Sequence, residues 1–229
     1  MLVLHQLHRV DEQSAAAFES VVRQSLLPAQ EGAPARLVWY ARALPDSFGG
    51  AEIATMTVID GPRGIELLSV DDGSAVCEAL SEMRRLRRSV ENRLTRFLTF
   101  SPIRDELSGP VGLSDGPMLY LHDFVTPQRG SFDEYDRELD TWYRELLKLE
   151  QGPSSKVWAG LQVVPGGGVA RECVVIGRIP EPGRFARTVV NGLPESLPGP
   201  LGEWMRIAKK LRDTWTSRLV LAPAWSPLR

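Results

Sequence analysis

Two histidines at matching points of the sequence are the side chains best suited to chemistry near neutral pH. Leu4-His5 lies near the start of the chain, and Leu121-His122 repeats the pair 117 residues later. An imidazole that faces a cavity can act as a general base, or can ligate a metal or haem iron. His5 and His122 are therefore candidate catalytic residues. The alternative is that both are core histidines whose ring nitrogens bond to neighbouring groups.

Four large aromatic side chains form the second candidate group. Trp39 and Tyr40 lie in the first half of the chain, and Tyr120 and Trp158 lie in the second. Inside a cavity they would offer flat apolar surface to an aromatic molecule, so all four are candidate ligand-binding residues. The alternative is that they pack a sheet against helices.

Other chemical motifs are not found in the sequence. No set of His, Cys, Asp and Glu residues has the spacing of a metal site, so we expect no metal. Asp123 follows His122, but successive strand residues face opposite sides, so the two are not expected to form a dyad. Gly166-Gly167-Gly168 lies between two expected strands and does not open a helix, which argues against a phosphate-binding loop. We therefore expect no bound cofactor.

The histidine pair belongs to a longer internal repeat. The residues around Trp39 recur around Trp158, an offset of 119. Met83-Arg84 recurs as Met205-Arg206 at an offset of 122, and the motif 101–104 recurs at 226–229 at an offset of 125. The offset only grows, as expected for a duplication followed by short loop insertions. The sequence therefore predicts repeat 1 over 1–107, a linker over 108–117 and repeat 2 over 118–229.

In repeat 1, alternating and near-continuous apolar runs predict strands over 2–10, 36–44 and 52–60. The first of these strands would place Gln6 and His8 on one face and His5 on the other. A helix is expected over 11–27, with Ser25 among its inner residues. A second helix begins near Met83, follows an apolar stripe of three- and four-residue spacings to Phe97, and runs into a short strand at 96–100. No element is assigned to 61–82.

Repeat 2 shows the same order with clearer signals. Strands are expected over 118–125, 156–164, 171–179 and 219–221. Ser131 and Glu134 have the form of a capping box at the start of a helix that ends before Gly152-Pro153. A later helix carries an apolar stripe from Trp204 to Trp215. The order in each repeat is βαββαβ, the ferredoxin-like arrangement.

A four-stranded sheet with two helices on one face leaves its other face apolar and in need of cover. The sister repeat is the nearest candidate. Two sheets packed face to face can form an eight-stranded barrel, whose interior is either filled or wide enough for one small ligand. The predicted fold class is thus α+β, with two ferredoxin-like βαββαβ repeats packed sheet to sheet as a pseudo-dimeric α+β barrel.

This chain resembles the dimeric α+β barrel superfamily. The resemblance rests on the element order, the acidic helix start Val10-Asp11-Glu12, Trp39-Tyr40 on the second strand, and the tandem copy with Trp158. It looks like a fused version of antibiotic biosynthesis monooxygenase-like or stress-responsive barrels. The resemblance implies a cofactor-independent oxygenase, cyclase or isomerase, although the superfamily also contains haem-binding proteins and members without known reaction.

Composition narrows the classes of partner. The chain has 229 residues, of which 43% are hydrophobic and 24% charged, as in an ordinary globular protein. A net charge of −2 and a pI near 6.0 give no electrostatic reason to expect nucleic acid. The sequence has no long apolar run and no signal-peptide start, so we expect a cytoplasmic protein without a membrane partner. The excess of Arg over Lys suggests a bacterial origin.

Taken together, the sequence predicts a small-molecule enzyme of bacterial secondary metabolism. It would act as a cofactor-independent oxygenase, cyclase or isomerase on an apolar or aromatic substrate held in the barrel. The alternative is a non-catalytic barrel that binds a small ligand or is purely structural, with haem binding as a minor variant. Unpaired sheet edges would let two copies associate, so the sequence leaves a homodimer as an alternative to a monomer.

Overall fold

The structure is a computed structural model of residues 1–229, and it describes all of them except 45–49, 70–71, 109–115, 149–153, 191–198 and 229. The described chain forms two compact units. Unit 1 consists of Met1–Arg96, Val111–Pro117 and Val220–Arg229, and unit 2 consists of Phe97–Pro110 and Met118–Leu219. The expected linker 108–117 lies largely outside the described residues. Each unit is treated separately below.

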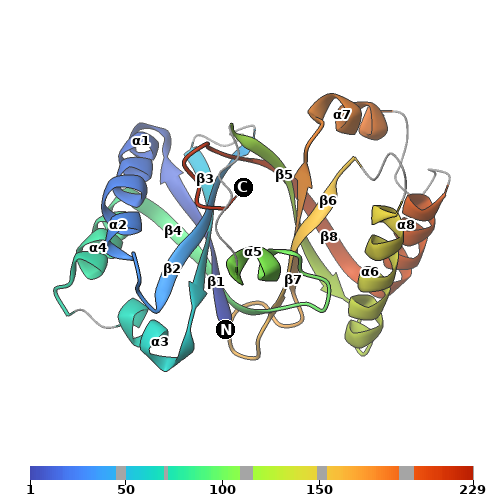
Figure 1. The fold of residues 1–229 in the computed structure, drawn as a ribbon, viewed down its shortest axis with the longest axis horizontal. Coiled ribbons are helices and arrows are strands. Elements are labelled where there is room, and N and C mark those ends of the chain that lie inside the picture. The colour runs from blue at the N-terminus through green and yellow to red at the C-terminus, as the bar shows by residue number, and fades with distance from the viewer. Residues whose placement is uncertain (45–49, 70–71, 109–115, 149–153, 191–198, 229) are drawn as a thin grey trace. The chain divides into compact units, whose positions relative to one another are not determined.

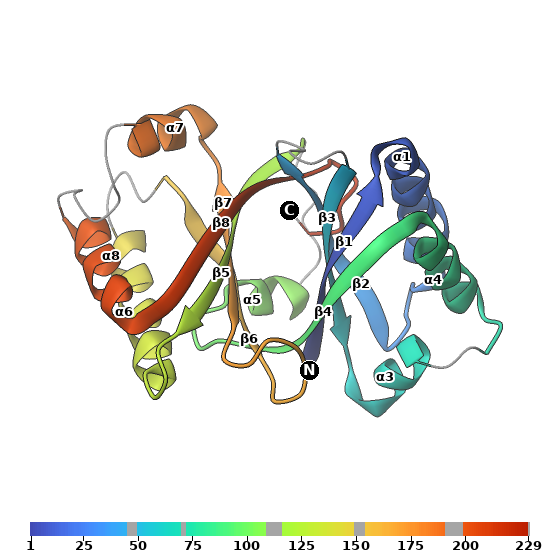
Figure 2. The ribbon, with the colours of Figure 1, turned by 180° about the vertical axis from the view of Figure 1, so that it is seen from behind.

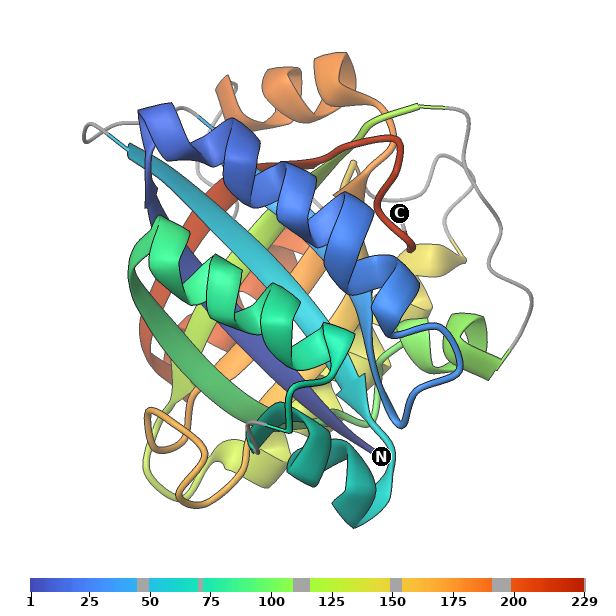
Figure 3. The same ribbon diagram turned by 90° about the vertical axis from the view of Figure 1, so that its left-hand side faces the viewer.

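Unit 1 is a four-stranded antiparallel sheet whose strands follow the order β4-β1-β3-β2. The strands are β1 (Leu2–Asp11), β2 (Ala35–Leu44), β3 (Gly50–Ile59) and most of β4 (Arg87–Phe97). Two antiparallel helical segments lie side by side across one face of this sheet (Figure 3). They are α4 (Ala75–Leu86) and a continuous run made of α1 (Glu12–Val21), η1 (Val22–Leu26) and α2 (Leu27–Ala29).

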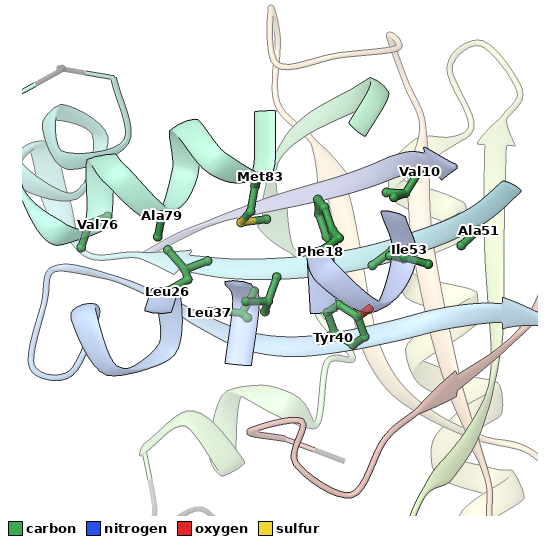
Figure 4. Close-up of a cluster of buried hydrophobic side chains, with 12 residues drawn as sticks. Val10, Phe18, Leu26, Leu37, Tyr40, Ala51, Ile53, Val76, Ala79 and Met83 are labelled. Carbon is green, nitrogen blue, oxygen red and sulfur yellow. The ribbon is translucent and has the colours of Figure 1, made fainter. Parts of the chain in front are cut away.

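The helix-covered face of the unit 1 sheet carries a buried apolar core. Phe18, Ile53 and Met83 meet between the helices and the sheet, and Tyr40 lies beside them on β2 (Figure 4). The expected inner residue Ser25 is exposed, and Leu26 is buried instead. The reason is the π-helical segment η1, which shifts the inward face by one residue.

A helix that the sequence did not predict follows β3. This helix, α3 (Gly61–Ser69), packs against β2 and α4. Its Gly64 approaches the sheet so closely that an added Cβ would lie 2.5 Å from the carbonyl oxygen of Pro34. The segment Gly61-Pro62-Arg63-Gly64 suggested only a chain break, because glycine and proline are poor helix formers. Close packing on the sheet overrides that local preference.

Unit 2 repeats the topology with the strand order β8-β5-β7-β6. Its strands are β5 (Met118–Pro127), β6 (Lys156–Val163), β7 (Cys173–Ile179) and most of β8 (Arg212–Ala222). The helices α6 (Phe132–Leu147) and α8 (Pro200–Leu211) lie side by side on one face of this sheet (Figures 1 and 2). Its counterpart of α3 is α7 (Pro182–Val190), and α5 (Ile103–Ser108) also belongs to this unit. The predicted α+β class with two ferredoxin-like repeats is confirmed.

Three expected details are wrong. The helix expected over 83–97 ends at Leu86, and Arg87–Phe97 is strand β4, because the apolar stripe continues from a helix into an alternating strand. For the same reason Trp215 lies on β8 and not on the last helix. Ser131 precedes α6, but its side chain makes no capping hydrogen bond.

In each repeat, the end of the fourth strand and the segment after it belong to the unit of the other repeat. Residues 97–110 of the first repeat are part of unit 2, and residues 220–229 of the second are part of unit 1. Within unit 1 the Ser226 hydroxyl accepts a hydrogen bond from the Tyr40 backbone N–H at 3.0 Å. Within unit 2 the Ser101 hydroxyl accepts one from the Gly160 N–H at 3.1 Å. The serine of the repeated Ser-Pro motif therefore accepts an equivalent backbone hydrogen bond in each unit, and these two hydrogen bonds are called the latches below.

Candidate functional site

A cavity of about 390 Å³ lies in unit 1 between the helix-covered face of the sheet and the segments η1, α3 and α4. This volume is at the small end of the range seen for ligand pockets. Apolar side chains from all four strands and the three helical segments line most of it, among them Leu4, Leu26, Leu37, Leu80 and Leu94. Such walls suit a small and largely apolar molecule.

Alternation along β1 places a polar group among these apolar walls. Gln6 is level with Thr55 on β3 and with Asn92 on β4, and all three line the cavity. The Gln6 side-chain amide donates to Oδ1 of Asn92 at 2.7 Å. Because that bond uses one amide hydrogen and one carbonyl oxygen, the pair keeps further donors and an acceptor for a ligand.

His8 lies beside the cavity, on the same face of β1 as Gln6, and it forms hydrogen bonds with two lining residues. Its Nε2 lies 3.0 Å from Oγ1 of Thr55, and its Nδ1 lies 3.0 Å from Nη1 of Arg87. A guanidinium can only donate, so Nδ1 accepts and the ring proton is on Nε2, which donates to Thr55. The Thr55 hydroxyl thus accepts from His8 and keeps its own hydrogen for an acceptor other than His8, and Thr55 also lines the cavity.

The state of His8 follows from its surroundings. The imidazole is fully buried, and burial followed by the nearby charge of Arg87 lowers its pKa to about 3. His8 is therefore neutral near pH 7, and its remaining lone pair is used by Arg87. It fixes the orientation of Thr55 and Arg87 but is too weak a base to take a proton from a ligand at neutral pH.

The charged groups of the cavity are arginines. Arg84 and Arg87 line it, and the lining includes no Asp or Glu among the described residues. Burial lowers the pKa of Arg87, and the positive charge of Arg84 acts in the same direction. Arg84 and Ile65 are exposed, which marks the side where the cavity opens to solvent. The cavity thus combines apolar walls with a positively charged edge.

His5 and Trp39, two residues singled out from the sequence, lie on the opposite face of the unit 1 sheet. Their positions form one row across the strands, in the order Arg93, His5, Met56 and Trp39. Each of the four is buried, with relative exposures of 6%, 0%, 1% and 0%. The structure therefore aligns His5 with Trp39, with Met56 between them, and places neither on the cavity lining.

Tyr40 does not share the surroundings of Trp39. It faces the helices, and its ring lies 4.6 Å from that of Trp225 in the C-terminal segment. Burial raises the pKa of Tyr40 well above its usual range. Successive strand residues point to opposite faces, so Trp39-Tyr40 contributes one aromatic ring to each side of the sheet.

In unit 2 the predicted residues form two groups. The His122 ring lies 4.6 Å from that of Phe124. Tyr120 and Trp158 have ring centroids 5.3 Å apart, and the Arg178 guanidinium lies 4.8 Å from the Trp158 ring. The structure thus brings Tyr120 and Trp158 together.

Glu106 of α5 binds both Arg178 and the Trp158 indole. It accepts two hydrogen bonds from Arg178, each of 2.8 Å, and one of 2.9 Å from the Trp158 indole. The Glu106 carboxylate therefore neutralises Arg178 and anchors α5 to unit 2.

Sequence reasoning missed His8, Arg87 and α3 as parts of a site. One signal was present, because the alternation of β1 already placed Gln6 and His8 on the same face. Arg87 was assigned to the expected helix from Met83 to Phe97, whereas it is the first residue of β4. Among the described residues no group of three or more His, Cys, Asp or Glu side chains could hold a metal ion. None of the described helices is long and apolar enough to cross a bilayer.

Solved structures share this fold across nearly the whole chain. A monooxygenase described as putative from Fusobacterium nucleatum has a TM-score of 0.67 at 5% identity, covering 97% of this chain and 92% of its own. Another from Lactobacillus acidophilus has a TM-score of 0.63 at 9% identity, covering 98% and 97%. An anthrone oxidase-like protein has a TM-score of 0.62 at 11% identity, covering 96% and 90%.

At these identities the likeness shows the fold alone. It confirms the ferredoxin-like α+β fold that the element order predicted. No protein-family model and no curated protein matches the sequence. The choice of function therefore depends on the geometry of the site.

Proposed function

We propose that the unit 1 cavity binds a small, largely apolar molecule, and that the protein acts on it as an oxygenase, cyclase or isomerase without a bound cofactor. The observation that carries this proposal is a leucine-lined cavity of about 390 Å³ with a defined polar side. The monooxygenases and the anthrone oxidase-like protein of the same fold support the choice of reaction type.

The polar side suits a substrate with an ionisable carbonyl or phenol. The Thr55 hydroxyl would donate to an oxygen on which negative charge develops, and the positive charge of Arg87, which is linked to Thr55 through His8, would favour that negative charge. Donors fixed in advance in an apolar surrounding stabilise such charge strongly. An enolate or phenolate held there is electron-rich, and it could react with molecular oxygen or rearrange without help from a metal or flavin.

An enzymatic scheme also needs a group that accepts the substrate proton. Among the described lining residues no side chain has a basic lone pair suited to neutral pH, and His8 has a pKa of about 3. The substrate must then ionise in solution. This same observation favours a second candidate, a carrier that binds the ligand without converting it.

An oxygen electrode and a binding assay separate the two candidates. An anthrone is a suitable probe because it ionises readily and consumes oxygen on oxidation. We expect saturable oxygen uptake above the uncatalysed rate, and its loss in Ile65→Trp, which narrows the cavity from its exposed side. Saturable binding without oxygen uptake would indicate the carrier. If neither binding nor uptake responds to Ile65→Trp, the cavity is not the site.

The roles of His5 and His122 as bases, with Trp39, Trp158, Tyr40 and Tyr120 as an aromatic platform, form a separate proposal. In unit 1 it requires the sheet face that carries His5 and Trp39, which excludes Tyr40 because Tyr40 faces the helices, whereas the cavity requires the face that carries His8. Loss of turnover in His5→Ala or His122→Ala, with unchanged turnover in Ile65→Trp, would favour the histidine proposal. The reverse pattern would favour the cavity.

A further inference from the structure

We infer that the natural ligand of the unit 1 cavity is a small apolar carboxylic acid, bound as its anion. Its head group contacts Arg87 and Arg84, and its apolar body lies among the leucines. The inference rests on the proposed use of this cavity as the ligand site, and it adds the chemical class of the ligand.

The first support is the unbalanced charge of the lining. Arg84 and Arg87 are three residues apart at the end of α4 and the start of β4, and both contribute to the cavity. The neighbouring acidic residues form ion pairs with other arginines: Glu82 pairs with Arg85, and Asp11 pairs with Arg88. Within the described residues no ion pair joins a carboxylate to Arg84 or Arg87.

The second support is the partner that Arg87 does have. It donates to Nδ1 of His8, an uncharged acceptor, so its positive charge is not neutralised by that bond. Arg87 is also half-buried beside another cation. A partly desolvated cation without a counterion is costly, and a bound anion would remove much of that cost.

The third support is the geometry expected of the head group. A guanidinium presents a planar fork of donors that matches a carboxylate, and His8 occupies part of the fork of Arg87 while holding its orientation. The remaining polar lining residues, including Thr55, Gln6 and Asn92, are neutral. One half-buried and one exposed arginine suit a single negative charge better than the two charges of a phosphate.

The test compares three probes that share one ring system: 1-naphthoate, 1-naphthalenemethanol and 1-naphthyl phosphate. Calorimetric titration at pH 7.5 should show naphthoate binding at least about tenfold more tightly than the alcohol, as expected for a charge-assisted hydrogen bond. Arg87→Gln should reduce the affinity for naphthoate to that for the alcohol and leave the alcohol affinity nearly unchanged. Arg88→Gln is the matched control and should change neither, because Arg88 is exposed and does not line the cavity.

The outcomes separate the two proposals. Equal affinity for naphthoate and the alcohol would overturn the carboxylate inference while leaving the cavity as a ligand site. Tighter binding of the phosphate than of naphthoate would also overturn it. No binding of any probe, or binding that Ile65→Trp leaves unchanged, would overturn the proposed site itself.

Discussion

The helix-covered faces of the two units share one topology but differ in how they are filled. The helices α4 and α8 end directly before the fourth strands, which places their residues in correspondence at an offset of 125. By this correspondence Trp204 in unit 2 takes the place of Ala79 in unit 1. Tyr143 lies on α6, which covers unit 2 as the run of α1, η1 and α2 covers unit 1, and that run includes the cavity residue Leu26.

These aromatic rings pack against one another in unit 2. Trp204 lies 5.9 Å from Tyr135 and 6.2 Å from Tyr143, measured between ring centroids. In unit 1, Leu26 lines the cavity, and the small Ala79 lies in the adjoining core. The side chains on this face therefore differ between the two units, with aromatic rings packed together in unit 2 and a leucine-lined cavity in unit 1, although the backbone topology is the same.

The polar residues differ in the same way. His8 of unit 1 corresponds to Val125 of unit 2, and Gln6 corresponds to Asp123. Arg87, which bonds to His8, corresponds to Arg212, which lies 4.0 Å from the Trp215 ring centroid. Duplication thus left two copies of one scaffold, of which unit 1 carries the arginine and histidine arrangement suited to an anion.

Truncation of the unit 2 core should have the largest effect. Trp204→Ala removes a buried ring and should lower the free energy of unfolding by about 3–5 kcal/mol. Urea denaturation followed by circular dichroism measures the change. A loss below about 1 kcal/mol would mean that Trp204 does not fill the core as described, and that the contrast with Ala79 has no energetic meaning.

The pH dependence of stability should differ in sign between the two units. The pKa of His8 is lowered from 6.5 to about 3, so unfolding is accompanied by proton uptake between these values. Its contribution to stability is complete above pH 6.5 and is lost as the pH falls towards 3. Asp123 behaves oppositely, because burial raises its pKa from 3.8 to about 6, and its contribution is lost as the pH rises through this window.

Two variants isolate these contributions. The free energy of unfolding of His8→Asn should fall less steeply than that of the wild type as the pH is lowered from 6.5. That of Asp123→Asn should respond less to pH between about 4 and about 6. Parallel pH profiles for the wild type and both variants would contradict the described environments.

Introducing a unit 2 side chain into unit 1 should close the cavity. Leu26→Tyr places in the cavity lining an aromatic ring of the kind that packs unit 2, and it should weaken the binding of 1-naphthoate at least about tenfold, or about 1.4 kcal/mol. Leu147→Tyr is a matched control at an exposed helix position in unit 2 and should leave binding unchanged. Wild-type affinity in Leu26→Tyr, with normal thermal unfolding, would show that ligand does not occupy this space.

The two latches should make equal and modest contributions to the free energy of unfolding. Ser226→Ala and Ser101→Ala each leave a buried backbone N–H without its acceptor, so each should cost about 1–2 kcal/mol. Thermal unfolding of the single variants measures this. A large loss from one and none from the other would show that the repeated Ser-Pro motif serves different purposes in the two units.

The sequence predicted the βαββαβ order twice and most strand positions, but it matched two residue pairs incorrectly. Trp39 was matched with Trp158, whereas the register places Ala159 opposite Ile176 as Trp39 lies opposite Met56. Both β2 and β6 contain a β-bulge within this motif, so residues at the same place in the motif do not pair with equivalent residues of the neighbouring strand. Met83 was matched with Met205, about one helical turn away from its structural counterpart, Ala208.

Local patterns alone determined the elements and their order, because alternation, helical periodicity and turn residues act over a few neighbouring positions. They also determined that Gln6 and His8 share a face of β1, since strand geometry fixes this. Only the tertiary structure decided that this face borders a cavity and that Arg87 meets His8. The open space depends on the combined volumes of side chains from four strands and three helical segments, and no single stretch of sequence specifies that sum.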